Sequence, residues 1–346
     1  MINIKKSIEE IKPYKVNNKE CCIKLDANES SYLLKNFTLD MNNLKPNLYP
    51  DSDSTLLRSN MAKYYGCKSK NIIVGNGSSE LILTIINAFC EPNENIMTFH
   101  PSFSMYEIYS KLTSTNHIKI DSEDNYSFDT DKIIEYTDIY NPKIIIICNP
   151  NNPTGYYIEK EEIIRILDSI NNTVVIMDEA YIDFGGDSTV DLINEYDNII
   201  IMRTLSKAFG LAGMRIGCMI SNENFIEELW KMKLPYNLNS ASQIIANKYF
   251  EKIDEIKDNI NRIIEERDKL SYKLKELGLK TYPSKGNFIM VETKINSFSK
   301  KLEEKGILIR DFTKIIKNHY RITVGTEEEN KYLIKEVKEL IKWEKV

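Results

Sequence analysis

Short apolar runs alternate with amphipathic segments over the central part of the chain. The runs, at residues 72–74, 96–99, 144–148, 174–177, 199–202 and 216–220, are mostly continuous and β-branched. Such runs are typical of strands that are buried on both faces of a parallel sheet. The segments 79–89, 104–112 and 159–169 between them repeat their apolar residues at helical spacing. This alternation predicts an α/β fold, doubly wound, with a mainly parallel sheet and helices on both faces.

The pattern changes after Pro235. Residues 240–277 have helical spacing without proline or glycine, which predicts one long helix that ends at Gly278. The remainder predicts strand 288–291, helix 297–304, strands 307–309 and 320–323, and helix 327–343. We therefore expect residues 1–45 to form an N-terminal arm and part of a small domain, and residues 46–238 to form the large domain. Residues 239–346 are expected to form the small α+β domain, beginning with the long connecting helix.

Composition and charge narrow the function classes. The 346 residues are 42% hydrophobic and 28% charged, with a formal net charge of −5, which argues against a nucleic-acid partner. No apolar stretch approaches the roughly 18 residues of a membrane span, and residues 1–10 lack the apolar core of a signal peptide. The histidines lie far apart, so we expect no metal site. We expect a cytoplasmic protein.

Lys207 stands in the segment T-L-S-K-A-F-G-L-A-G-M-R-I-G, which spans residues 204–217 and follows a predicted strand. The ordinary interpretation of a lysine among small residues is a surface group in a turn. Here Ser206 supplies a hydroxyl beside the amine, and Arg215 supplies a planar cation suited to a phosphate dianion. A phosphate held beside a lysine amine is what a pyridoxal 5′-phosphate site requires.

Three further loops follow predicted strands. Asp178 and Tyr181 stand in V-I-M-D-E-A-Y, and an acid at the carboxyl end of a parallel strand commonly faces a ligand. Asn152 stands in N-P-N-N-P-T-G, whose prolines and asparagines predict a rigid loop. Gly77 stands in G-N-G-S-S-E before a predicted helix, where backbone N–H groups form an anion site. The alternatives are a metal or ribose contact or a helix cap for the acid, a plain turn for the second loop, and a cap for Ser78.

Residues 204–217 closely resemble the lysine signature of the fold-type-I aminotransferases, which depend on pyridoxal 5′-phosphate. The T-L-S before the lysine is similar to the histidinol-phosphate branch of that family. Three other segments resemble the same branch: L-D-A-N-E at 25–29, P-Y-N-L-N at 235–239 and G-N-F-I at 286–289. The resemblance thus spans the chain from Pro13 to the last helix and implies the fold of a fold-type-I transferase. After Pro13-Tyr14 the usual Pro-Gly is absent, which leaves the fine substrate specificity open.

This resemblance implies roles around the cofactor. Lys207 would form the Schiff base and act as the general base, while Asp178 would keep the pyridine nitrogen protonated. Tyr181 and Asn152 would contact the phenolate oxygen. Phe103 would stack on the ring, although a core aromatic is the alternative for this residue. The other implied cofactor contacts are Gly77, Ser78, Ser79, Thr204, Ser206, Arg215 and, from a partner subunit, Tyr49.

The resemblance also implies the substrates. Arg321 would pair with a phosphate or carboxylate, Arg310 would add a second positive charge, and Asn28 and Tyr14 would be further substrate contacts. The implied reaction converts L-histidinol phosphate and 2-oxoglutarate into imidazole-acetol phosphate and L-glutamate, in histidine biosynthesis. The position of Tyr49 implies a homodimer with shared active sites, and a surface tyrosine is the alternative.

Two other functions stay open. One is a different activity of the same fold, an aromatic-amino-acid aminotransferase or a threonine-phosphate decarboxylase, which a substrate panel would separate. The other is a non-catalytic regulator that binds the cofactor. The complete set of Asp178, Tyr181, Lys207 and Arg215 argues against the regulator, as does the absence of an added DNA-binding segment.

Overall fold

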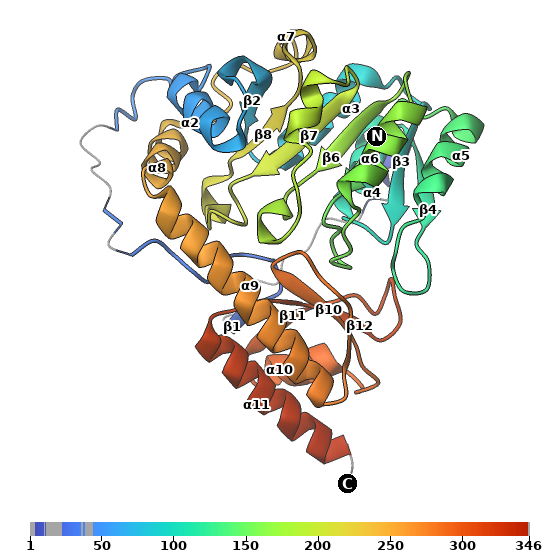
Figure 1. Ribbon diagram of the computed structural model, residues 1–346, viewed down its shortest axis with the longest axis vertical. Coiled ribbons are helices and arrows are strands. Elements are labelled where there is room, and N and C mark those ends of the chain that lie inside the picture. The colour runs from blue at the N-terminus through green and yellow to red at the C-terminus, as the bar shows by residue number, and fades with distance from the viewer. Residues whose placement is uncertain (1–3, 10, 12–22, 36, 39–43, 345–346) are drawn as a thin grey trace.

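The computed structural model describes residues 4–9, 11, 23–35, 37–38 and 44–344. Within them, a seven-stranded sheet forms the centre of the larger part of the molecule (Figure 1). Its strands in chain order are β2 (Ile72–Gly75), β3 (Asn95–His100), β4 (Asn116–Asp121), β5 (Ile144–Cys148), β6 (Val174–Asp178), β7 (Ile199–Thr204) and β8 (Gly217–Ile220). Their spatial order is β2-β8-β7-β6-β5-β3-β4, and only β8 pairs antiparallel with its neighbours. The predicted mainly parallel sheet is confirmed.

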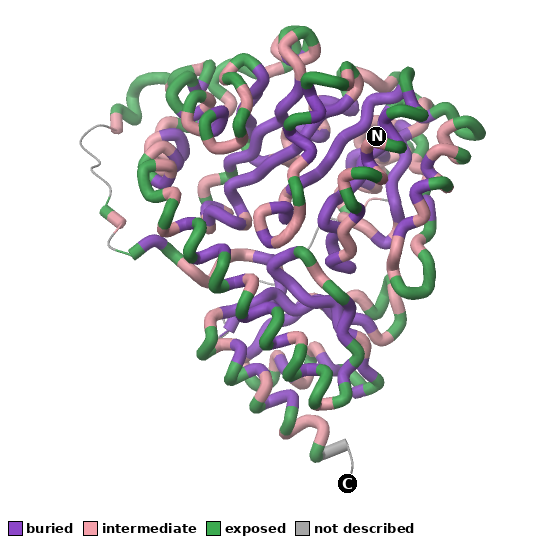
Figure 2. The backbone as a smooth tube through the Cα atoms, in the orientation of Figure 1, coloured by how far each residue is buried: buried purple, intermediate pink, exposed green. Residues whose placement is uncertain are grey.

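Helices cover both faces of this sheet. They are α2 (Thr55–Tyr65), α3 (Ser78–Phe89), α4 (Met105–Thr113), α5 (Thr130–Tyr140), α6 (Lys160–Ser169) and α7 (Glu223–Trp230), and the short α1 (Lys6–Glu9) precedes them. β5 is buried on both faces, which is why its apolar run is continuous. Ile145 and Ile147 pack in the core on one face of the sheet, while Ile144 and Ile146 pack in the core on the other. Figure 2 shows the resulting buried centre between two half-exposed helical layers.

Residues 240–277 do not form the single helix that the sequence predicts. The structure divides them into α8 (Ser240–Phe250) and α9 (Ile253–Glu276), because Lys252 leaves the helical conformation at φ −117° and ψ 32°. Ala246 and Tyr249 of α8 pack in the core of the large sheet, whereas Leu270 and Leu274 of α9 pack in the small domain. The packing partner changes within α9 and not at the break, since Ile256, Ile260 and Ile263 still pack in the core of the large sheet. No proline or glycine marks the break, so the helical spacing gave no signal of it.

A five-stranded sheet in the order β1-β11-β12-β10-β9 forms the smaller part of the molecule. Its elements are β1 (Ile23–Leu25), β9 (Lys280–Thr281), β10 (Phe288–Glu292), α10 (Phe298–Glu304), β11 (Ile307–Asp311), β12 (His319–Thr323) and α11 (Glu327–Glu344). β1 pairs in parallel with β11, so the N-terminal segment contributes a strand to this sheet. In Figure 1, α9 runs from the large sheet down to the small one and lies beside α11. The predicted domain boundaries at 45/46 and 238/239 stay predictions.

None of the helices in the described part of the chain is both long enough and apolar enough to cross a membrane.

Candidate active site

A pocket lies at the carboxyl ends of the parallel strands, between the large and the small sheet. Cys148, Asp178 and Thr204 end β5, β6 and β7, and all three line the pocket. This position at the strand ends is where α/β sheets bind their ligands. Most of the predicted site residues line it, namely Ser78, Ser79, Phe103, Asn152, Asp178, Tyr181, Thr204, Ser206, Lys207, Arg215, Arg310 and Arg321.

Lys207 is not the surface lysine of the ordinary interpretation. It is only partly exposed, and its Nζ donates a hydrogen bond to the Ala27 carbonyl oxygen at 2.9 Å. Burial, together with the positive charges of Arg321 and Arg215, lowers the pKa of Lys207 to about 7, while Glu29 opposes them. A large fraction of the amine is therefore neutral near neutral pH. A neutral amine can attack an aldehyde or accept a proton, which a protonated lysine cannot do.

Asp178 is buried at the end of β6, with 4% of its surface exposed. Its Oδ2 accepts a hydrogen bond from the Tyr106 hydroxyl at 2.6 Å, and its Oδ1 accepts one from the Ala180 N–H at 3.2 Å. Burial raises the pKa of Asp178 above its ordinary value, and these two hydrogen bonds counteract that rise. A carboxylate held in this way can hold a cationic group of a ligand, such as a protonated pyridine nitrogen.

The Tyr181 hydroxyl receives two amide donors. Asn28 Nδ2 lies 3.1 Å and Asn152 Nδ2 lies 3.3 Å from the phenol oxygen. Since both amides donate, the proton of the phenol is left to donate into the pocket. Asn28 was expected to contact substrate, but it is not among the residues that line the pocket and its side chain reaches Tyr181 instead.

The start of α3 forms a cradle for an anion. Gly77 precedes the helix at φ +84°, and Ser78 and Ser79 are its first two residues. A Cβ on Gly77 would lie 2.7 Å from Arg215 Nη2, and a Cβ on Gly217 would lie 2.3 Å from the Ser78 nitrogen. Gly217 is thus required for the close approach of β8 to the helix start, because the atom it meets is backbone, while Gly77 leaves room for the flexible end of Arg215. Backbone N–H groups, a helix dipole and a guanidinium together suit a phosphate dianion.

Phe103 and Thr204 complete the surroundings of the lysine. Phe103 is half-buried, lines the pocket and meets the Tyr106 ring edge-on at 5.5 Å between centroids. The Thr204 hydroxyl donates to the Ile216 carbonyl oxygen at 3.1 Å and accepts from the Ser206 N–H at 3.1 Å. Thr204 therefore fixes the loop that carries Ser206 and Lys207. A neutral amine, a phosphate cradle, an aromatic wall and a buried carboxylate in one pocket fit pyridoxal 5′-phosphate.

Two arginines face the pocket from the small sheet. Arg310 of β11 and Arg321 of β12 are directly opposed in the antiparallel register, and both line the pocket. Arg321 donates to Asn152 Oδ1 and, at 2.7 Å, to the Asp26 carbonyl oxygen. The strand pairing thereby places two positive charges side by side, next to the loop that holds Asn152.

The family model for aminotransferase class I and II matches residues 21–337. The chain belongs to this family. It is 43% identical to the histidinol-phosphate aminotransferase of Thermoanaerobacter sp. (strain X514), with 98% of each chain covered. It is 42% identical to the histidinol-phosphate aminotransferase of Clostridium novyi, with 94% of each covered.

The fold comparison agrees with the sequence comparison. A crystal structure of histidinol-phosphate aminotransferase from Sinorhizobium meliloti in complex with pyridoxal-5′-phosphate aligns with a TM-score of 0.89 at 19% identity, covering 99% of this chain and 98% of the other. At that identity the likeness concerns the fold alone. The predicted fold-type-I architecture of this aminotransferase is confirmed.

Among the described residues, three predicted site residues, Gly77, Asn28 and Tyr49, do not line the pocket of this aminotransferase. Tyr49 is 80% exposed, and its ring stacks on that of Tyr236 at 4.4 Å with an interplanar angle of 17°. Tyr14 lies outside the described residues. The contact of Tyr49 with a partner subunit's phosphate and that of Tyr14 with substrate stay predictions.

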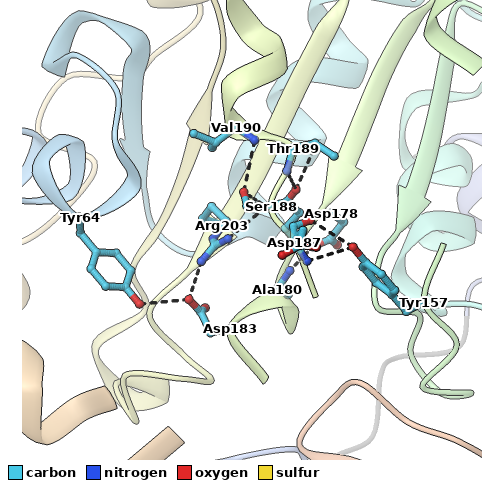
Figure 3. Close-up of polar contacts among 11 residues, drawn as sticks. Tyr64, Tyr157, Asp178, Ala180, Asp183, Asp187, Ser188, Thr189, Val190 and Arg203 are labelled. Carbon is cyan, nitrogen blue, oxygen red and sulfur yellow. Dashed lines mark hydrogen bonds and ion pairs between the residues drawn. The ribbon is translucent and has the colours of Figure 1, made fainter. Parts of the chain in front are cut away.

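The sequence missed a buried network behind the pocket, which Figure 3 shows. Arg203 is 4% exposed, and its two terminal nitrogens lie 3.0 Å from Glu179 Oε2 and 2.7 Å from Asp183 Oδ1. Tyr64 donates to Asp183 Oδ1 at 3.1 Å. The sequence also missed Tyr106 as the partner of Asp178. Phe103 precedes the N-cap of α4, so no helical spacing joined the two rings and the sequence carried no signal for this contact.

Proposed function

We propose that this aminotransferase transfers the amino group of L-histidinol phosphate to 2-oxoglutarate, giving imidazole-acetol phosphate and L-glutamate in histidine biosynthesis. The observation that carries the proposal is the opposed pair Arg310 and Arg321, which suits a dianionic phosphate on a substrate. The names of the curated relatives, at up to 43% identity over nearly the full chain, support the same substrate. From a biosynthetic role of this kind we predict a cytoplasmic location.

The residues of the pocket divide the work of the reaction. Bound pyridoxal 5′-phosphate supplies a ring that withdraws electrons from the substrate Cα. Asp178 would hold the protonated ring nitrogen, and Tyr181 would donate a hydrogen bond to the ring oxygen. Arg215 and the start of α3 hold the cofactor phosphate. Lys207 would serve as the base that removes the proton from the substrate Cα and returns it later in the reaction.

Arg321 has two tasks in this proposal. In one half of the reaction it binds the phosphate of histidinol phosphate, and in the other it binds a carboxylate of 2-oxoglutarate or glutamate. A planar guanidinium can pair with either group through two parallel hydrogen bonds. Arg310, opposite it in the strand register, adds the second charge that a phosphate requires and a monoanionic carboxylate does not.

We also propose that the working unit is a homodimer. Large apolar side chains are exposed on two segments that lie together: Leu48, Tyr49 and Leu56 on one, and Met232, Leu234 and Tyr236 on the other. The stacking of Tyr49 on Tyr236 and the hydrogen bond from Lys233 Nζ to the Ser52 carbonyl oxygen join the segments. An exposed apolar patch of this kind suits a second copy of the chain, whose cofactor phosphate Tyr49 would reach. Light scattering and a Tyr49→Phe variant test this proposal.

The central test uses covalent trapping and a substrate panel. Borohydride reduction of the protein loaded with cofactor, followed by digestion and mass spectrometry, should place a pyridoxyl group on the Lys207 peptide. Addition of histidinol phosphate to the unreduced protein should bleach its absorbance near roughly 410–430 nm, the region of a lysine Schiff base. Fast turnover of phenylalanine without turnover of histidinol phosphate would instead favour an aromatic aminotransferase.

A matched variant separates the substrate from the chemistry. Arg310→Gln should raise the KM for histidinol phosphate about tenfold, since it removes one charge-assisted contact to the phosphate. The KM for glutamate in the reverse half-reaction should change much less. Equal effects on both substrates would contradict the assignment of Arg310 to the phosphate.

A further inference from the structure

The Tyr106 hydroxyl donates the shorter of the two hydrogen bonds that Asp178 accepts. Tyr106 is the second residue of α4, is 1% exposed, and donates to Asp178 Oδ2 at 2.6 Å. The other carboxylate oxygen receives only the longer bond from the Ala180 N–H, at 3.2 Å. Tyr106 lies 72 residues before Asp178 in the chain, so this contact exists only because α4 packs over the strand ends.

The hydrogen bond bears on where a shared proton rests. Burial raises the pKa of Asp178, and the neighbouring Glu179 raises it further; the Tyr106 hydrogen bond is the largest influence that lowers it, ahead of Ala180 and Lys207. A donor to a carboxylate stabilises its charged form. Without Tyr106 the carboxylate would bind a proton more tightly, and it would compete with a ring nitrogen for the proton between them.

We propose that Tyr106 is a positioning residue that keeps this shared proton on the cofactor's ring nitrogen by weakening the proton affinity of Asp178. The inference rests on the proposed function, since it assumes that Asp178 faces the pyridine ring. Tyr106 donates to Asp178, meets the edge of Phe103, lies beside Cys148, and is not among the residues that line the pocket. Its influence on the reaction therefore passes through the carboxylate and not through substrate.

The test places the proton directly. Wild-type protein and Tyr106→Phe are loaded with pyridoxal 5′-phosphate labelled with ¹⁵N in the ring, and the ¹⁵N chemical shift is measured. In Tyr106→Phe the shift should move toward the value of unprotonated pyridine. The kcat for histidinol phosphate should fall about tenfold with little change in KM, the loss expected for one hydrogen bond to a charged group. A ¹⁵N shift equal to that of the wild type would overturn the inference.

A matched control separates this effect from general destabilisation. Tyr64→Phe also removes a phenol donor from a carboxylate, Asp183, but on the side of the molecule away from the pocket. It should leave the ¹⁵N shift unchanged, and a shift as large as that of Tyr106→Phe would overturn the inference. Should Tyr106→Phe fail to fold, 3-fluorotyrosine at position 106 keeps the ring and strengthens the donor. It should keep the ¹⁵N shift at the protonated value of the wild type, and a move toward the value of unprotonated pyridine would contradict the inference.

The two proposals fail in different ways. If borohydride leaves no pyridoxyl group on Lys207 of the wild type, the proposed function fails and the inference with it. If the wild type carries the group and the Tyr106→Phe spectrum matches it, only the inference fails.

Discussion

Two neighbouring acids at the end of β6 have opposite surroundings. Asp178 faces the pocket, and in the described part of the chain no cation lies within ion-pairing distance of it; its two hydrogen bonds come from uncharged donors. Glu179 pairs instead with Arg203 and accepts hydrogen bonds from Ser188 and Thr189. The carboxylate on one side of the strand therefore has a cationic partner within the chain. The other keeps an unbalanced charge, which is what a site for a cationic ring requires.

The nearby basic groups, Arg203 beside Glu179 and Lys207 in the pocket, also have opposite pKa shifts. We call the side of Glu179 and Arg203 the network side, and the side of Asp178 and Lys207 the pocket side. On the network side the pKa of Arg203 is raised, because Asp183 and other neighbours outweigh the effect of burial. On the pocket side the pKa of Lys207 is lowered to about 7, because burial and two arginines act together against its charge. The network side serves stability and the pocket side serves chemistry, and substitutions should separate the two.

The largest effect is expected for Arg203→Met. The substitution leaves the buried carboxylates of Glu179 and Asp183 without their cation, and breaking a buried ion pair in this way costs about 3–5 kcal/mol. Urea unfolding of the apoprotein should show this loss in the free energy of unfolding. The folded fraction should retain a kcat within about threefold of the wild type, because an effect under about 0.7 kcal/mol on the barrier is expected for a group outside the pocket.

A compensating variant checks the cause. Arg203→Met combined with Glu179→Gln and Asp183→Asn removes the charges together, and it should recover part of the lost stability. A triple variant no more stable than Arg203→Met would show that the packing of the arginine, including its position 4.7 Å over the Tyr65 ring, matters more than charge balance.

The next largest effect is expected for Asp178→Asn, which should lower kcat and not stability. An amide cannot balance a protonated ring nitrogen, so kcat should fall by about 10²-fold, the scale of one lost electrostatic contact in a catalytic site. The free energy of unfolding of the apoprotein should stay the same or rise, because the buried, unbalanced charge is removed. Glu179→Gln is the control, and it should lose stability while keeping kcat. Similar stability losses in both variants would contradict the division between the two sides.

Substitution of a glycine near the phosphate cradle should have a smaller effect, on the affinity for the cofactor. A Cβ at Gly217 would lie 2.3 Å from the Ser78 nitrogen, whereas a Cβ at Gly213 meets nothing within 4 Å. Gly217→Ala should therefore displace the start of α3 and weaken the binding of pyridoxal 5′-phosphate about tenfold, equivalent to one charge-assisted hydrogen bond. Gly213→Ala should leave the affinity unchanged. Equilibrium titration of the apoproteins compares them, and equal affinities would indicate that the cradle is not where the phosphate binds.

The pocket side was better predicted from the sequence than the network side. The lysine segment and the loop around Asp178 carry recognisable motifs, and the β-branched run 144–148 has the bounds of β5. β4 was missed because polar residues such as His117 and Lys119 interrupt its apolar pattern on an edge strand. The pairing of Glu179 with Arg203 depends on how β6 and β7 align and on the adjoining turn, and the contact of Tyr106 depends on where α4 packs. Neither is encoded in local spacing.

The smallest effect concerns the pH dependence of Lys207 in the apoprotein. Only the neutral amine can attack an aldehyde, and with a pKa of about 7 half of Lys207 is neutral near pH 7. The rate of capture of pyridoxal 5′-phosphate should therefore rise steeply below pH 7 and only about twofold from pH 7 to its plateau. An ordinary lysine, with a pKa near 10.5, would instead gain about tenfold for each pH unit up to 10. Stopped-flow absorbance measures the rate, with Lys207→Arg as the blank. A rate that keeps rising tenfold per pH unit above pH 8 would show that the pocket does not lower the pKa of Lys207. Lys207 would then stay charged at neutral pH, as Arg203 does on the other side of the strand.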